Sequence, residues 1–190
     1  MRDIKLQPTS TAHWHDLVCE AEHHSQQNLG EEVQSYLVFL LQRFLSKPEI
    51  TSRVLALDYL KSLRTAGKRQ FEKLRDVGDI CLLHAGFFPQ RARRRRVSVN
   101  YYVDLGTGAY YQLHHYTSHN QGQLFEHLYE SFIPAMDVLQ AMKTMDNPQP
   151  LLDPLMAHEL WEHTCSQQAR KALIKDGNKT LIRTQTIQKH

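Results

Sequence analysis

The chain has 190 residues, of which 41% are hydrophobic, which is enough for one domain with an ordinary buried core. Its longest strongly apolar run, 36–41, is far shorter than the roughly 20 residues of a membrane-spanning helix. The three cysteines lie far apart and outside any C-x-x-C pair, which argues against a disulfide framework and a structural zinc site. We therefore expect a cytoplasmic protein without a transmembrane segment. The formal net charge of +3 is uneven, because two basic segments, 91–96 and 170–189, stand against an acidic remainder.

Apolar residues recur at helical spacing along most of the chain, and strict two-residue alternation is nearly absent. This pattern predicts an all-α protein, a compact bundle of about seven helices. The first helix is expected over 11–27. The second, over 31–46, is apolar nearly all round and should lie at the centre of the bundle. A third is expected over 47–65, after a capping-box spacing from Ser46 to Glu49.

Two glycine-containing helices are expected on either side of the arginine run. The first spans 68–88, and the second spans 99–118 with Ser98 as its N-cap. We expect these two helices to pack closely through their glycines, since a residue without a Cβ lets a neighbouring backbone approach. The arginine run between them is expected to form a loop.

The C-terminal part of the chain is expected to contain two further helices. One spans 121–145 with a kink at Pro134, because a proline inside a helix removes one backbone hydrogen bond and crowds the preceding turn. An Asp-Pro pair at 153–154 is a strong start for the last helix, expected to end near position 175. The predicted organisation is one helical domain over 1–176 and a flexible basic tail over 177–190.

Twelve histidines make a metal site the first hypothesis to weigh. His158 and Glu162 lie about 40° apart on a helix and could share one ion. His115 and His119 are one helical turn apart, which suits two imidazole ligands of one ion. Neither pair is a complete ligand set, so no cofactor is predicted. These four residues are the candidates if a metal binds.

No catalytic signature accompanies them. The chain has no nucleophile elbow, no cysteine in a motif context and no phosphate-binding glycine loop. We therefore assign no catalytic residue, and an enzyme built from unremarkable residues stays open as an alternative.

The arginine run is the candidate site. Guanidinium groups are planar and permanently charged, which suits them to carboxylates and phosphates. Tyrosines nearby would supply stacking faces if the partner were a nucleic acid. The candidate anion-binding residues are Arg91, Arg93, Arg94, Arg95, Arg96, Tyr101 and Tyr111.

Several functions fit such a run. The main prediction is a non-catalytic regulatory or adaptor protein that docks an anionic partner, such as an acidic protein surface, through this segment. The alternatives are an RNA- or DNA-binding protein that uses the same segment, and a His/Glu metalloprotein of redox or hydrolytic type. Membrane headgroups, a solvated loop paired with the acidic body, and a homo-oligomer also stay open.

Part of the chain carries a recognisable pattern of glycines and aromatic residues. The pattern reads Gly78-Asp79, Gly86-Phe87-Phe88-Pro89, Asn100-Tyr101-Tyr102 and Gly106-x-Gly108-Ala109-Tyr110. It resembles the signature of a family of uncharacterised bacterial proteins, over about residues 33 to 142. The resemblance implies a bacterial cytosolic setting and one structural unit over 78–110. It implies no activity, ligand or catalytic residue.

Overall fold

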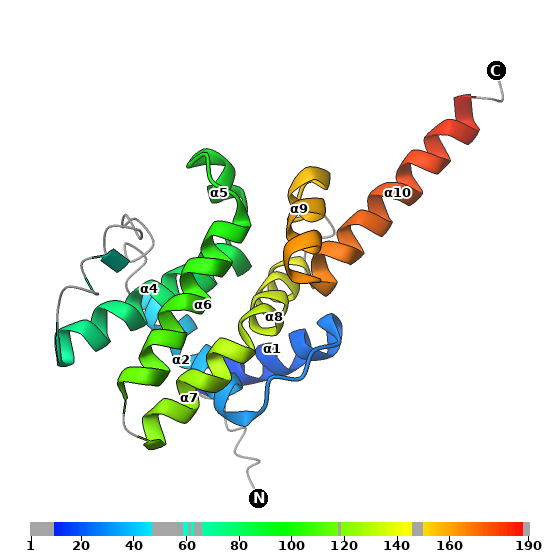
Figure 1. The fold of residues 1–190 in the computed structure, drawn as a ribbon. Helices are drawn as coiled ribbons and strands as arrows, with labels where there is room; N and C mark the ends of the chain where they lie inside the picture. Colours follow the sequence, from blue (N-terminus) through cyan, green and yellow to red (C-terminus); the bar gives the residue numbers. More distant parts are fainter. Residues whose placement is uncertain are drawn as a thin grey trace, which may run out of the picture.

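The structure, a computed structural model, describes residues 10–46, 59–60, 62, 66–117, 119–145 and 150–187, without the side chains of 119–121 and 178–187. The helices are α1 (Ser10–Ser25), α2 (Glu31–Ser46), α4 (Lys68–Gly86), α5 (Gln90–Arg94), α6 (Val99–Tyr116), α7 (His119–Glu130), α8 (Phe132–Met145), α9 (Pro154–Thr164) and α10 (Gln167–Ile187) (Figure 1). The described residues contain no strand, so the all-α prediction is confirmed, with nine helices where about seven were expected. Most of the predicted third helix lies outside the described residues. No helix in the described ranges is long and apolar enough to cross a membrane.

The second half of α4 is the most enclosed part of the bundle. Every residue from Val77 to Gly86 is buried. In contrast, α2 is buried on one face only, and its Phe39 is 63% exposed. The prediction that 31–46 lies at the centre is therefore wrong. The polar residues of α4 had argued against a central position for this helix. One of them, His84, is accommodated in the core because its ring stacks on that of Tyr102, with the centroids 4.9 Å apart.

α4 and α6 pack through glycines, as the sequence predicts. A Cβ built on Gly78 would lie 2.5 Å from Cε1 of Tyr110, which is too close for any side chain at this position. A Cβ on Gly106 would lie 2.7 Å from the Cβ of Cys81 on α4. These two positions set how closely the helices approach. Gly78 and Tyr110 of the signature therefore meet in one contact between the two helices, and Gly106 lies against α4 as well.

The predicted helix over 121–145 is two helices that meet at Ser131. The backbone N–H of Ser131 still donates to the His127 carbonyl at 2.8 Å, and the Ala135 N–H donates to the Ser131 carbonyl at 2.8 Å. Between them Pro134 has no N–H to donate, and its ring crowds the turn before it. The proline therefore ends one helix and starts another where a kink was expected.

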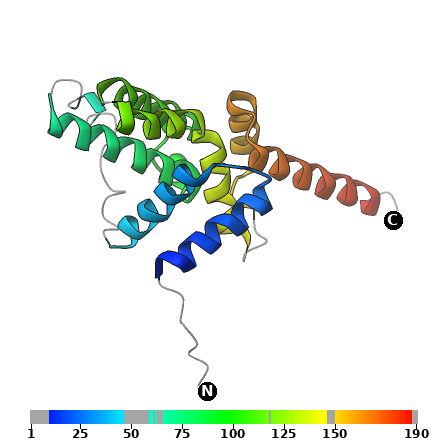
Figure 2. The same cartoon turned by 90° about the horizontal axis from the view of Figure 1, so that it is seen from below.

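The predicted last helix is also two helices. Asp153 is the expected N-cap of α9, and its side chain accepts a hydrogen bond from the Met156 N–H at 3.0 Å. Cys165, with φ of 55°, ends α9 in a left-handed conformation. α10 then runs through Gly177 to Ile187, so the backbone of the predicted tail continues a helix. Figures 1 and 2 show this end of α10 projecting away from the other helices.

The arginine run forms a helix where a loop was expected. Residues 90–94 make the short helix α5, and Arg95 and Arg96 form the turn that follows. Ala92 is 1% exposed and anchors this helix to the core. The next helix begins as predicted, because the Ser98 side chain accepts a hydrogen bond from the Tyr101 N–H.

Candidate functional site

The predicted arginines lie together on α5 and the turn after it. Arg93, Arg94, Arg95 and Arg96 are exposed. Arg91 is half-buried, with its guanidinium carbon 4.4 Å from the ring centroid of Phe88. The short helix therefore turns most of its positive charge toward solvent.

Arg93 lies near a carboxylate of the chain, that of Asp153. Its Nη1 lies 3.7 Å from Oδ2 of Asp153, and the arginine side chain is 80% exposed. An ion pair of this length in water is weak, so it does not cancel the field of the segment.

The two candidate tyrosines lie at different ends of α6. Tyr101 is half-buried near α5, and its ring meets that of Tyr102 edge-on at 5.2 Å. Tyr111 lies about 18 Å from the start of α6, at 1.5 Å of rise per residue. There its ring packs against His115 and Tyr129, with centroids 4.4 Å and 5.4 Å away. Tyr101 therefore lies in the first turn of α6, next to the arginine segment in the chain, and Tyr111 lies apart from it.

A cavity of about 800 Å³ opens beside α5, and we call it the arginine cavity. It lies between α5, the segment 150–153, the start of α9 and one face of α10. Leu151 and Leu152 are buried and supply apolar surface. The charged lining residues are Arg93, Arg94, Asp153, Lys175 and Asp176.

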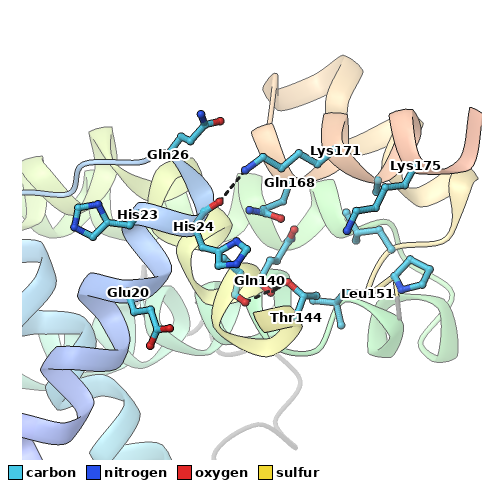
Figure 3. A pocket seen from close by; sticks show the side chains of 14 residues that line it. Glu20, His23, His24, Gln26, Gln140, Thr144, Leu151, Gln168, Lys171 and Lys175 are labelled. Atoms are coloured by element: carbon cyan, nitrogen blue, oxygen red, sulfur yellow. Dashed lines mark hydrogen bonds between the residues drawn. The ribbon is translucent and has the colours of Figure 1, made fainter. Parts of the chain in front are cut away.

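A second cavity of about 770 Å³ lies on the other side of the same segment, and we call it the lysine cavity (Figure 3). It lies between α1, α8 and α10. The Lys171 Nζ donates a hydrogen bond of 2.8 Å to the His24 carbonyl, which is at the C-terminal end of α1. The lining residues common to both cavities are Pro150, Leu151, Leu152, Ala172 and Lys175.

Four residues that line the two cavities, Leu151, Leu152, Lys171 and Lys175, were not among the predicted site residues. The apolar pair Leu151-Leu152 stands next to Pro150, and Lys171 and Lys175 are four residues apart on a basic helix. The four-residue spacing places the lysines on one helical face, which was the available signal. The position of Lys175 in one cavity with Arg93 and Arg94 depends on how α10 folds back against the 150–153 segment.

Those metal candidates whose side chains the structure describes are not grouped into a ligand set. His158 Nδ1 lies 3.5 Å from Oε2 of Glu162, and both side chains are more than half exposed. His115 contacts the Tyr111 ring, and the side chain of His119 lies outside the described residues. In the described part of the chain, no three histidine, cysteine, aspartate or glutamate side chains are grouped as metal ligands.

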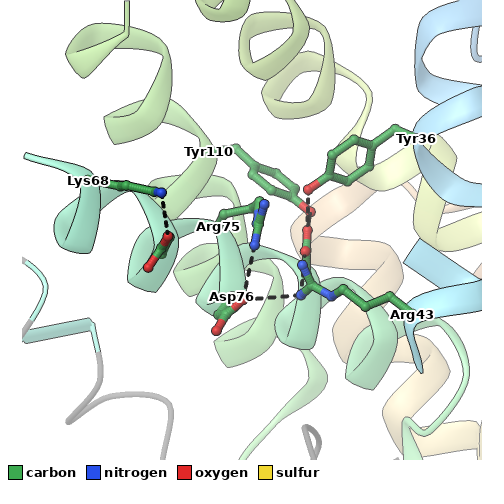
Figure 4. A network of polar contacts seen from close by, with 8 residues as sticks. Tyr36, Arg43, Lys68, Arg75, Asp76 and Tyr110 are labelled. Atoms are coloured by element: carbon green, nitrogen blue, oxygen red, sulfur yellow. Dashed lines mark hydrogen bonds and ion pairs between the residues drawn. The ribbon is translucent and has the colours of Figure 1, made fainter. Parts of the chain in front are cut away.

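A buried polar network lies between α2, α4 and α6 (Figure 4). The Asp79 carboxylate accepts hydrogen bonds from the hydroxyls of Tyr36, at 2.5 Å, and Tyr110, at 2.8 Å. Arg43 Nη2 lies 2.8 Å from its other oxygen and 3.2 Å from Asp76. Burial raises the pKa of Asp79 above its ordinary value, although Arg43 and the two hydroxyls oppose the rise. Asp79 is 1% exposed, whereas the side chains of Arg43 and Asp76 at the edge of the network are 30% and 29% exposed, so Asp79 joins the helices from within the core.

Burial also raises the pKa of both tyrosines well above the ordinary value, and the neighbouring Asp79 carboxylate adds to the rise. Both hydroxyls therefore stay protonated and remain donors to the carboxylate.

No protein-family model, curated protein or solved structure matches the chain significantly.

Proposed function

We propose that this chain is a non-catalytic regulatory or adaptor protein that docks an anionic protein partner through α5 and the arginine cavity. The observation that carries the proposal is the position of Arg93 and Arg94, which are exposed and line a cavity with an apolar floor. Guanidinium groups bind carboxylates with two parallel hydrogen bonds, and the apolar floor contributes by excluding water. The proposal assigns no catalytic residue and no cofactor.

The aromatic residues favour a protein partner over RNA or DNA. Single-stranded nucleic acids are commonly held by bases stacked on exposed aromatic rings. The Tyr101 ring is half-buried against Tyr102, and Tyr111 lies far along α6. The apolar side chains that line the arginine cavity include Leu151, Leu152 and Met156, which suit apolar side chains of a protein better than bases.

Binding of defined polyanions tests the proposal. Fluorescently labelled polyglutamate and a single-stranded RNA of mixed sequence are titrated with the wild-type chain, with Arg93→Gln plus Arg94→Gln, and with Lys68→Gln plus Arg69→Gln. The last variant removes the same charge from the exposed N-terminal turn of α4. Glutamine has nearly the helix propensity of arginine, so α5 is preserved.

Wild type and the α4 variant should bind polyglutamate, with an affinity that falls as salt rises. The α5 variant should bind it at least about tenfold more weakly, equivalent to about 1.4 kcal/mol. Equal binding by the two variants would remove α5 as the site. Tighter binding of the RNA, also lost in the α5 variant, would replace the protein partner by a nucleic acid.

A further inference from the structure

We propose that the element bound here is a protein segment with acidic residues at both ends and a large apolar side chain between them, lying across the arginine and lysine cavities. This inference rests on the proposed function and adds the chemistry of the partner. Its basis is the distribution of groups over the two cavities: Arg93 and Arg94 line only one of them, Lys171 lines only the other, and Lys175 and several apolar residues line both.

The apolar stretch is the part that both cavities share. Leu151 and Leu152 are 9% and 4% exposed, and Ala172 adds a small side chain from α10. Because Ala172 fills little space, room is left above the two leucines. A leucine, phenylalanine or tryptophan of a partner would lose its contact with water there, and burial of one such side chain is a large share of the binding free energy of an interface.

Cations flank this stretch on both sides. Arg93 and Arg94 line the arginine cavity, Lys171 lines the lysine cavity, and Lys175 lines both. Figure 3 shows Lys171 and Lys175 projecting from α10 along the lysine cavity. Asp153, Asp176 and Glu20 also line the cavities, so the surface is not uniformly positive. Carboxylates of a partner are therefore favoured beside Arg93 and Arg94 at one end and beside Lys171 and Lys175 toward the other.

The size of the cavities favours a segment over a single side chain or a small anion. Each cavity, at about 800 Å³ and about 770 Å³, is as large as a pocket that encloses a whole small-molecule ligand. Since they share their apolar residues, one chain segment can occupy both. A free phosphate or carboxylate would pair with the cations and leave the apolar part of the two cavities unfilled.

Two synthetic peptides of one composition test this distribution of groups. The first has glutamates at both ends of a leucine-tryptophan-leucine centre, and the second has all its glutamates at one end. Both carry the same label, and labelled polyglutamate is the charge-only probe. Binding is measured by fluorescence anisotropy for wild type, Ala172→Trp, Met156→Ser and Lys175→Gln, with Lys68→Gln as the charge-matched control. Circular dichroism and the thermal midpoint confirm that each variant is folded.

Wild type is expected to bind the first peptide at least about tenfold more tightly than the second peptide or polyglutamate, because one large apolar side chain is buried. Ala172→Trp fills the shared stretch and should remove this preference while leaving polyglutamate binding unchanged. Met156→Ser should weaken the preference without adding bulk. Lys175→Gln should weaken binding of the first peptide several-fold, and Lys68→Gln should leave it unchanged.

Different failures point to different errors. If all probes bind wild type equally, and Arg93→Gln plus Arg94→Gln abolishes that binding, the acidic-apolar-acidic segment is wrong and the proposed function stands. If the α5 variant binds every probe as wild type does, the proposed function fails as well. If wild type is a dimer by light scattering and Ala172→Trp is a monomer, a second copy of the chain occupies the surface and the inference is overturned.

Discussion

The Tyr110 hydroxyl donates a hydrogen bond of 2.8 Å to the Asp79 carboxylate, from α6 to the centre of α4. The tyrosine ring passes over Gly78, where a Cβ would lie 2.5 Å from it. The Gly78-Asp79 pair and the distant Tyr110 are therefore two sides of one contact. This gives the glycine and aromatic pattern of 78–110 a structural role, since the glycine admits the ring and the aspartate receives its hydroxyl.

Replacing Asp79 should destabilise the protein strongly. Asp79→Ala leaves the hydroxyls of Tyr36 and Tyr110 and the Arg43 guanidinium without their shared acceptor. We expect a loss of about 3 kcal/mol in the free energy of unfolding, measured by urea denaturation. Asp76→Ala is the control, because Asp76 is partly exposed and its ion pair with Arg43 should contribute less than about 1 kcal/mol. Equal losses in the two variants would contradict the central role of Asp79.

The same carboxylate should make stability depend on pH. Burial raises the pKa of Asp79 above its ordinary value of 3.8, so the folded state binds the proton more tightly than the unfolded state. The contribution of Asp79 to the free energy of unfolding therefore falls as pH rises from 3.8 through the raised pKa. Asp79→Asn does not titrate at this position, so wild type should lose stability relative to it over that interval. Denaturant unfolding of both proteins at a series of pH values measures the difference, and a difference that is constant or of opposite sign would refute the assignment.

Two glycines of α6 should respond in opposite directions to alanine. At Gly106 a new Cβ would lie 2.6 Å from the Phe132 ring and 2.7 Å from the Cys81 Cβ, so overpacking should cost about 1–3 kcal/mol. At Gly108 the nearest atom is the Tyr59 hydroxyl at 3.7 Å, which is ordinary contact. Gly108→Ala should therefore stabilise by up to about 1 kcal/mol through helix propensity. Thermal unfolding of both variants decides this, and a stabilised Gly106→Ala would show that the helices are not in close contact there.

The start of α10 should depend on a residue of α8. Asp137 is fully buried and accepts hydrogen bonds from Ser166 Oγ at 2.5 Å and from the Gln167 N–H at 2.8 Å. Asp137→Ala should speed hydrogen exchange of the amides in the first turn of α10, since their acceptor is lost. We expect a cost of about 2 kcal/mol, as for a strong cap in a buried position. Unchanged exchange in this turn would mean that packing alone holds α10.

Structural features that depend only on residues close together in the chain could be predicted from the sequence. The second helix has the predicted bounds of 31–46, and Ser98 and Asp153 are N-caps as expected. Capping joins a side chain to an N–H three residues later, so the signal is contained in a short window. The charge of the arginine run is equally local. The helical conformation of the arginine run does not depend on local residues alone, because Ala92 becomes buried only when α5 packs on the core.

The composition and periodicity of the chain were sufficient for the helical class, most helix starts and the cationic character of the segment at 91–96, because each depends on residues within about one helical turn. The folded arrangement alone established the central position of α4, the cap that Asp137 supplies to α10 and the meeting of Lys175 with Arg94 around one cavity. These features join residues far apart in the chain, whose contact depends on the packing of whole helices. Between α4 and α6, the tight contacts at Gly78 and Gly106 and the buried acceptor at Asp79 determine that packing.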